Sequence, residues 1–230
     1  MERKIRYRDL PEEEKQIYWQ KLWQNGDTEF HLFQAHPDLV KYEDKLLKEK
    51  CRVFLPLCGK AVDLKYLAAK GHEVVGNEYC EEAILQFFDD QGIEYEKSQH
   101  PTAPYEIFRA TDKKITIYKG DYFGLNSSIV GKFDAIWDRG SFVAIDPSCR
   151  QQYADIIYDI MNTNGKYLLY SVEYEGNIST SPYNVTAQDL DVIYGKNFDF
   201  SVLETYETAY FNFVHLPVAI VSLIFLKSKK

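Results

Sequence analysis

The sequence predicts an α/β protein with a mostly parallel sheet, an antiparallel edge and helices on both faces. Short apolar runs alternate with longer amphipathic stretches, which is the pattern of strands joined by crossover helices. The chain has 230 residues, 45% of them hydrophobic, which is enough for one core. We expect a single domain over residues 1–230, with an N-terminal helical cap (1–50) and an α/β core (51–230).

The cap is expected to begin with a helix that reaches about Gln24. Proline and acidic residues at positions 11–14 suit a first helical turn, and Asn25-Gly26 stops it. Trp19 and Trp23 lie four residues apart and therefore share one face. Two further helices are predicted, a short one carrying Phe30 and Phe33 and another from Pro37 to about Lys50.

The core is expected to open with a βαβ unit. Residues 52–57 form an apolar run that ends in a turn at Cys58-Gly59, and a helix follows over 61–70. A second strand at 73–78 and a second helix at 81–91 complete the unit.

The rest of the core supplies five more sheet strands. The sequence predicts a hairpin of residues 105–110 and 115–119, whose second arm is the third sheet strand, and then strands at 133–138, 165–173, 201–208 and 218–227. Helices are expected at 148–161 and 187–194. Because no helix separates the last two strands, they should pair antiparallel at one edge.

In an open α/β sheet the ligand binds outside the carboxyl ends of the strands. Glu78 ends the second strand and lies 19 residues after Gly59, the spacing at which a carboxylate accepts both hydroxyls of a ribose. The other residues at strand ends are Leu57, Tyr79, Asp121, Tyr122, Asp138 and Arg139. A nucleoside ligand is therefore expected.

The single glycine of the turn at 57–62 favours a ligand without phosphates, because a pyrophosphate requires a Gly-x-Gly-x-x-Gly turn. S-adenosylmethionine fits, with Asp121 accepting from the adenine amino group and Tyr122 lying against the ring. Two alternatives stay open at this point. One is a nicotinamide-dependent oxidoreductase on the same kind of sheet, and the other is a non-catalytic module that binds the cofactor or serves only in interactions.

Composition argues against several other classes. A net charge of −8 disfavours nucleic acid and anionic membranes as partners. The apolar stretch 216–226 is too short to span a bilayer, and no secretory signal precedes the first helix. The four cysteines contain no paired motif and the five histidines no ligand spacing, so we expect reduced thiols, no metal and a cytoplasmic location.

Four stretches of the sequence are more specific. They are Trp19-Gln20-Lys21-Leu22-Trp23-Gln24-Asn25-Gly26 with Phe30, the stretch 54–63 containing Pro56-Leu57-Cys58-Gly59-Lys60, Gly71-His72-Glu73-Val74-Val75-Gly76, and 131–140 containing Ile136-Trp137-Asp138-Arg139-Gly140. In this order they resemble the thiopurine S-methyltransferase family, from about residue 12 to 195. Without this likeness the two tryptophans would be interpreted as core packing and Asp138-Arg139 as a surface ion pair.

The resemblance implies a Rossmann-like, seven-stranded class I methyltransferase that moves a methyl group from S-adenosylmethionine to the sulfur of a small aromatic or heterocyclic thiol. It implies an N-terminal lid of Trp19, Trp23 and Phe30. The implied cofactor residues are Trp19, Trp23, Leu57, Gly59, Glu78, Tyr79, Asp121, Tyr122 and Arg139. Arg139 and Asp138 are the expected catalytic residues, and Phe30, Trp23 and Arg139 should contact the thiol. The expected partner is this small molecule alone, with the protein acting as a monomer.

One stretch departs from the family pattern. The family has an arginine on the acceptor side near the penultimate strand, whereas residues 208–213 are Thr-Ala-Tyr-Phe-Asn-Phe. We therefore expect a methyl acceptor that is flatter or more apolar than a negatively polarised thiopurine.

Overall fold

The computed structural model describes residues 12–112, 114–176, 178, 181–209, 211 and 218–230. Its α-helices are α1 (Glu12–Asn25), α2 (Pro37–Leu46), α3 (Asp63–Ala69), α4 (Glu81–Gln91), α5 (Ser127–Val130), α6 (Arg150–Ile160) and α7 (Ala187–Tyr194). Its strands are β1 (Arg52–Leu55), β2 (Glu73–Glu78), β3 (Tyr95–Gln99), β4 (Glu106–Ala110), β5 (Ile115–Lys119), β6 (Phe133–Arg139), β7 (Met161–Glu173), β8 (Phe198–Thr208) and β9 (Ala219–Ser228).

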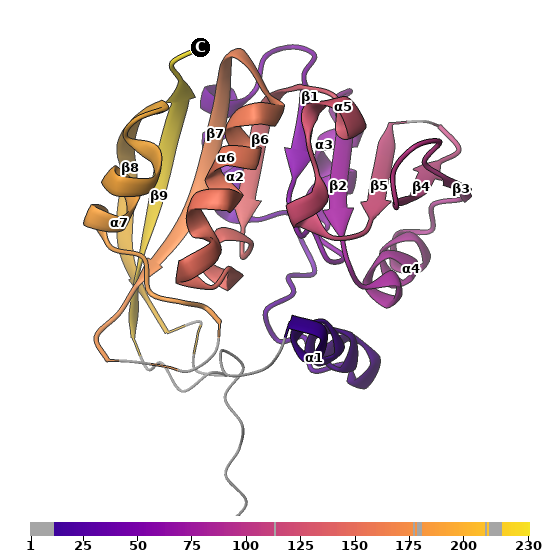
Figure 1. Cartoon of the computed structure of the whole chain (residues 1–230), viewed down its shortest axis with the longest axis horizontal. Helices are drawn as coiled ribbons and strands as arrows, with labels where there is room; N and C mark the ends of the chain where they lie inside the picture. Colours follow the sequence, from indigo (N-terminus) through magenta and orange to yellow (C-terminus); the bar gives the residue numbers. More distant parts are fainter. Residues whose placement is uncertain (1–11, 113, 177, 179–180, 210, 212–217) are drawn as a thin grey trace, which may run out of the picture.

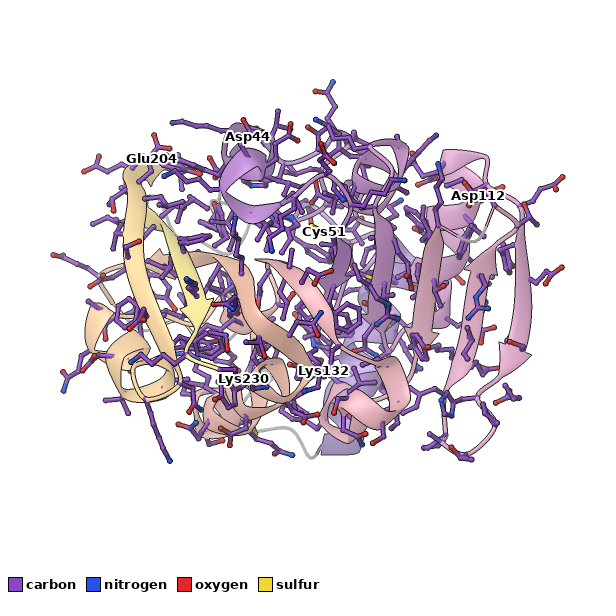
Figure 2. All side chains as sticks on the ribbon, turned by 90° about the horizontal axis from the view of Figure 1, so that it is seen from above. Asp44, Cys51, Asp112, Lys132, Glu204 and Lys230 are labelled. Carbon is purple, nitrogen blue, oxygen red and sulfur yellow. The ribbon has the colours of Figure 1, made fainter. Side chains whose placement is uncertain are left out.

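The strands form one sheet in the order β3-β4-β5-β2-β1-β6-β7-β9-β8. The central strands β5, β2, β1, β6 and β7 are parallel, and both edges are antiparallel. In Figure 1, α5, α6 and α7 lie in front of the sheet, and α2 and α3 lie behind it. Figure 2 looks along the sheet from above, with Glu204 and Asp112 near its two ends. The predicted α/β class is confirmed, and so is the antiparallel pairing of β8 with β9.

The described residues contain nine strands, whereas seven were predicted. The first arm of the predicted hairpin joins the sheet as β4, and β3 pairs with it at the edge. All five residues of β3, Tyr-Glu-Lys-Ser-Gln, are exposed. An edge strand without a buried face carries no alternation of apolar and polar residues, so the sequence gives no signal for it.

The central strands are buried on both faces, which accounts for their nearly continuous apolar sequences. Val53, Phe54, Ala135 and Ile136 in β1 and β6 are fully buried. Burial of this kind fixes the register of β1 against β6, where Val53 pairs with Ala135. The carboxyl ends of β1, β2 and β6 consequently meet at one edge of the sheet.

The N-terminal region differs from the prediction in two ways. Residues 27–36 form turns rather than a short helix, and the Phe33 side chain is 87% exposed. The helix α2 contacts β6 and β7 and buries Leu39 and Leu46 in the main core. Of the predicted cap, α1 and the turns of residues 27–36 therefore line the cavity at the carboxyl ends of the strands, where Figure 1 shows α1, whereas no residue of α2 does.

Candidate active site

A cavity of about 400 Å³ opens where the strands end. The helix α1, which lies below these strand ends in Figure 1, lines one side of it. It is lined by residues from strand ends, from α1 and from the turns that follow it. Ten of the residues singled out by sequence line it: Trp19, Trp23, Phe30, Leu57, Gly59, Glu78, Tyr79, Asp121, Tyr122 and Arg139. Asp138 does not.

The turn after β1 forms the floor of the cavity. Leu57 and Gly59 both have positive φ angles, of 41° and 51°. For leucine this conformation is strained, and such strain is concentrated at functional sites. The backbone N–H of Cys58 donates to the carbonyl of Asn77 at 2.8 Å, which ties the turn to the end of β2.

Aromatic side chains form the roof. The ring of Phe30 meets those of Trp23 and Trp19 edge-to-face, at centroid distances of 5.5 and 6.0 Å. Trp23 is 4% exposed and packs with Cys80 and Ala83 at the start of α4. The predicted lid residues are thus held together in one cluster over the turn after β1.

Glu78 presents a buried carboxylate to the cavity. Its Oε2 accepts from the N–H of Gly59 at 2.8 Å, and its Oε1 accepts from the N–H groups of Tyr79 and Cys80, both at 2.8 Å. Burial raises the pKa of Glu78, and these backbone donors oppose that rise. The carboxylate therefore joins the ends of β1 and β2 and keeps further acceptor capacity on its oxygens.

The turn after β5 places Asp121 at the cavity and turns the Tyr122 ring into the core. The Asp121 Oδ1 accepts from the N–H of Phe123 at 3.0 Å, as a cap of the short 3₁₀ turn. The Tyr122 ring is 2% exposed and stacks on Tyr153 at 4.5 Å. One face of the ring expected to lie against adenine is therefore already covered, and Phe123 lines the cavity beside it.

Arg139 stands at the end of β6 and reaches toward the roof. Its Nη1 donates to the carbonyl of Phe30 at 2.6 Å. A guanidinium at this place gives the cavity a permanent positive charge. It also fastens the turns after α1 to the sheet.

Asp138 lies outside the cavity and is fully buried, so its position does not support the predicted catalytic role. Its Oδ2 accepts from the hydroxyls of Tyr153 and Tyr167, at 2.6 and 2.7 Å. Its Oδ1 accepts from the N–H of Phe142 at 3.0 Å. Side chains alternate along a strand, so neighbours such as Asp138 and Arg139 point to opposite sides. Asp138 therefore anchors the turn that follows Arg139.

Several lining residues were not predicted: His31, Lys60, Asp63, Tyr170, Pro182 and Phe211. Asp63, at the start of α3, is buried and accepts from the N–H of His36 at 2.7 Å and from the Trp137 indole at 3.0 Å. Lys60 and Asp63 follow Gly59 by one and four residues, so their proximity to the predicted turn was a signal that could have identified them as site residues. Phe211 lies in the aromatic stretch 208–213 that the family pattern had placed on the acceptor side, although it was not named as a site residue, whereas no sequence signal marks Pro182.

The segment without the acceptor-side arginine is only partly described. Tyr210 and residues 212–217 lie outside the described residues. Phe211 is described, is 6% exposed and lines the cavity. At this point the cavity wall is aromatic.

Within the described residues, no group of three His, Cys, Asp or Glu side chains could hold a metal ion. The same part of the chain contains no helix that is both long and apolar enough to cross a bilayer.

Comparison with known proteins agrees with this geometry. The family model "Thiopurine S-methyltransferase (TPMT)" matches residues 14–221. A probable thiopurine S-methyltransferase of Danio rerio is 38% identical, covering 81% of this chain and 82% of that protein, and the thiopurine S-methyltransferase of Bos taurus is 39% identical, covering 81% and 78%.

Solved structures agree in fold. The Burkholderia thailandensis 1,6-didemethyltoxoflavin-N1-methyltransferase, solved with S-adenosylhomocysteine, superposes with a TM-score of 0.66 at 13% identity, covering 94% of this chain and 87% of that one. The glycopeptide N-methyltransferase MtfA, also solved with S-adenosylhomocysteine, gives 0.57 at 13% identity, covering 86% and 92%. The match over residues 14–221 and the identity to the curated relatives show that the chain belongs to the thiopurine S-methyltransferase family.

Proposed function

We propose that this protein methylates the sulfur, or the selenium, of a small aromatic or heterocyclic thiol, with S-adenosylmethionine as methyl donor. The observation that carries the proposal is the cavity where Glu78, Gly59 and Arg139 converge beneath an aromatic roof. Membership of the family supports the reaction class, and the lining of the cavity supports the residues proposed to bind the donor and the acceptor.

The cofactor side of the cavity fits an adenosine without phosphates. Gly59 has no side chain, so a ligand can approach the backbone of the turn. The Glu78 carboxylate is an acceptor suited to ribose hydroxyls, and Asp121 is an acceptor suited to an amino group. When bound there, S-adenosylmethionine supplies a methyl group activated by a sulfonium. Trp19, Trp23 and Phe30 exclude water, and their rings favour a nearby cation by about 0.5–2 kcal/mol.

The acceptor side needs no dedicated base, because an aromatic thiol is partly ionised near neutral pH and its thiolate is the nucleophile. Arg139 lowers the pKa of a thiol bound beside it by charge proximity. The remaining work is to orient the acceptor and to keep water out. The wall that contains Phe211 suits a flat apolar ring.

The proposed partner is a small molecule, and the proposed working form is a monomer. A net charge of −8 favours neither nucleic acid nor an anionic membrane as partner. A cytoplasmic location is part of the proposal, and the four free cysteines fit a reducing compartment.

The decisive experiment is a transfer screen with S-adenosylmethionine labelled in the methyl group, over aryl thiols, heterocyclic thiols, selenols and phenols. We expect label on sulfur or selenium and little on phenols. Calorimetric titration with S-adenosylhomocysteine and with NAD separates the oxidoreductase, which binds NAD, and a module that binds neither compound. A module that binds the cofactor without catalysis is separated by the transfer screen, in which it labels no acceptor. Transfer confined to carboxylated thiopurines would contradict the flat, apolar acceptor, and no transfer to any thiol would contradict the function.

A further inference from the structure

The segment 181–185 borders the cavity beside β7. Ser181 and Pro182 line the cavity, and the segment lies beside β7 through a bond from the N–H of Val185 to the carbonyl of Val172, at 2.9 Å. In the sheet, β7 lies beyond β6, whereas Glu78 ends β2 on the other side of β1. Ser181 and Pro182, here called the acceptor wall, therefore face the methyl acceptor rather than the adenosine.

Two side chains outside the cavity bind the acceptor wall and the two residues that follow it. The Tyr174 hydroxyl donates to the carbonyl of Pro182 at 2.9 Å. The Arg150 guanidinium donates to the next two carbonyls, through Nη2 to Tyr183 at 3.4 Å and through Nη1 to Asn184 at 3.0 Å. Three successive carbonyls are thus bound by two side chains that do not themselves line the cavity.

Arg150 is an unusual residue for this place. It is 2% exposed and lies over the Phe142 ring at 5.1 Å, in the first turn of α6. Burying a guanidinium is costly unless its donors are satisfied, and here Nη1 and Nη2 each donate to a backbone carbonyl, whereas the buried Nε has no hydrogen-bond partner among the described residues. The cost of burying Arg150 is therefore offset in part by its bonds to the carbonyls of Tyr183 and Asn184.

The same segment is joined to the site from the other side. The N–H of Tyr183 donates to the carbonyl of Val143 at 2.6 Å, and Val143 lines the cavity four residues after Arg139. The position of the acceptor wall relative to Arg139 therefore depends on how the segment 181–185 is held.

We propose that Arg150 and Tyr174 are positioning residues that fix the acceptor wall and thereby set the fit of the flat acceptor ring. This inference rests on the proposed function. Neither residue touches the adenosine side of the cavity, so both act on the acceptor and leave the cofactor unaffected.

The first test is Tyr174→Phe, which removes one hydrogen bond and no packing volume. The KM for the acceptor should rise about 3–10-fold, the fold-change of one lost hydrogen bond, while the Kd for S-adenosylhomocysteine stays within about twofold. Tyr66→Phe is the matched control, because its hydroxyl donates to Glu43 on the surface away from the cavity. An unchanged acceptor KM in Tyr174→Phe, or an equal change in the control, would overturn the proposal.

The second test needs no turnover. In Arg150→Lys, hydrogen exchange at the amides of Tyr183 and Val185 should accelerate about tenfold or more, because the guanidinium fork is lost. Unchanged exchange at these amides would also overturn the proposal. If the wild-type protein methylated no thiol, the proposed function would fail, whereas an active enzyme with an unmoved acceptor KM would refute only the positioning role.

Discussion

The Trp23 indole lies directly over Gly59, so closely that a Cβ on that glycine would sit 2.8 Å from Cζ2 of the ring. This contact packs α1 onto the turn after β1. The glycine therefore serves two purposes, since it adopts a positive φ angle and it leaves room for the roof.

Gly59→Ala should weaken the binding of S-adenosylhomocysteine about tenfold, because overpacking costs about 1–3 kcal/mol and displaces α1 from the turn. Calorimetric titration measures the change. Gly71→Ala is the control, since Gly71 also has a positive φ, of 95°, but nothing lies within 4 Å of its Cβ position. Equal effects of the two substitutions would assign the loss to backbone strain alone.

Glu78→Gln should weaken the binding of S-adenosylhomocysteine by about 1.5–3 kcal/mol, the cost of losing hydrogen bonds to a charged acceptor. Burial raises the pKa of Glu78, so on acidification this carboxylate should become protonated at a higher pH than an ordinary glutamate. The affinity of the wild-type protein for S-adenosylhomocysteine should begin to fall at that higher pH. Titrations between neutral and mildly acidic pH test both statements. Glu82→Gln, on the exposed part of α4, is the control, and a dissociation constant unchanged in Glu78→Gln would remove Glu78 from the site.

The ends of the central strands could be predicted because strands that are buried on both faces have continuous apolar sequences, and these runs show where each strand stops. Once Gly59 and Glu78 were placed at two such ends, parallel pairing of β1 and β2 brought them together. The bounds of α4 and α7 follow equally from local signals, such as Gly92 after α4 and the capping box at Thr186.

The rest could not be predicted because it depends on tertiary contacts. The direction of the Asp138 side chain is set by two tyrosines of α6 and β7, and the inward turn of Tyr122 by its stacking on Tyr153. The turns of residues 27–36 replace a helix because Phe30 is packed in the roof cluster. Local propensity contains none of this information.

Arg139→Met should lower kcat for an aryl thiol and move the acid limb of the pH profile of kcat upward, by about one pH unit or more, because a nearby cation lowers the pKa of the bound acceptor. At pH values well above the pKa of the thiol the deficit should shrink, since the thiolate then forms unaided. Arg109→Met, on the exposed side of β4, is the control. A uniform loss of rate at every pH would instead indicate a purely structural role, through the bond to the Phe30 carbonyl.

His36 should make the fold sensitive to acid. Its Nδ1 accepts from the N–H of Asp38 at 3.2 Å as the cap of α2, and its ring packs against Trp137 and Tyr170. Burial, with Arg139 nearby, lowers the pKa of His36 to about 3, against an ordinary value of 6.5. As the pH falls, protons bind the unfolded chain first, so its contribution to stability is complete above pH 6.5 and is lost progressively toward pH 3.

His36→Asn keeps a capping acceptor but removes the imidazole. The free energy of unfolding of the wild-type protein should therefore fall more steeply with decreasing pH than that of the variant, by up to about 1.4 kcal/mol per pH unit below pH 6.5. Urea unfolding at a series of pH values between 7 and about 5 measures the two slopes. Parallel slopes for the wild-type protein and His36→Asn would show that His36 is protonated in the fold as readily as in the unfolded chain.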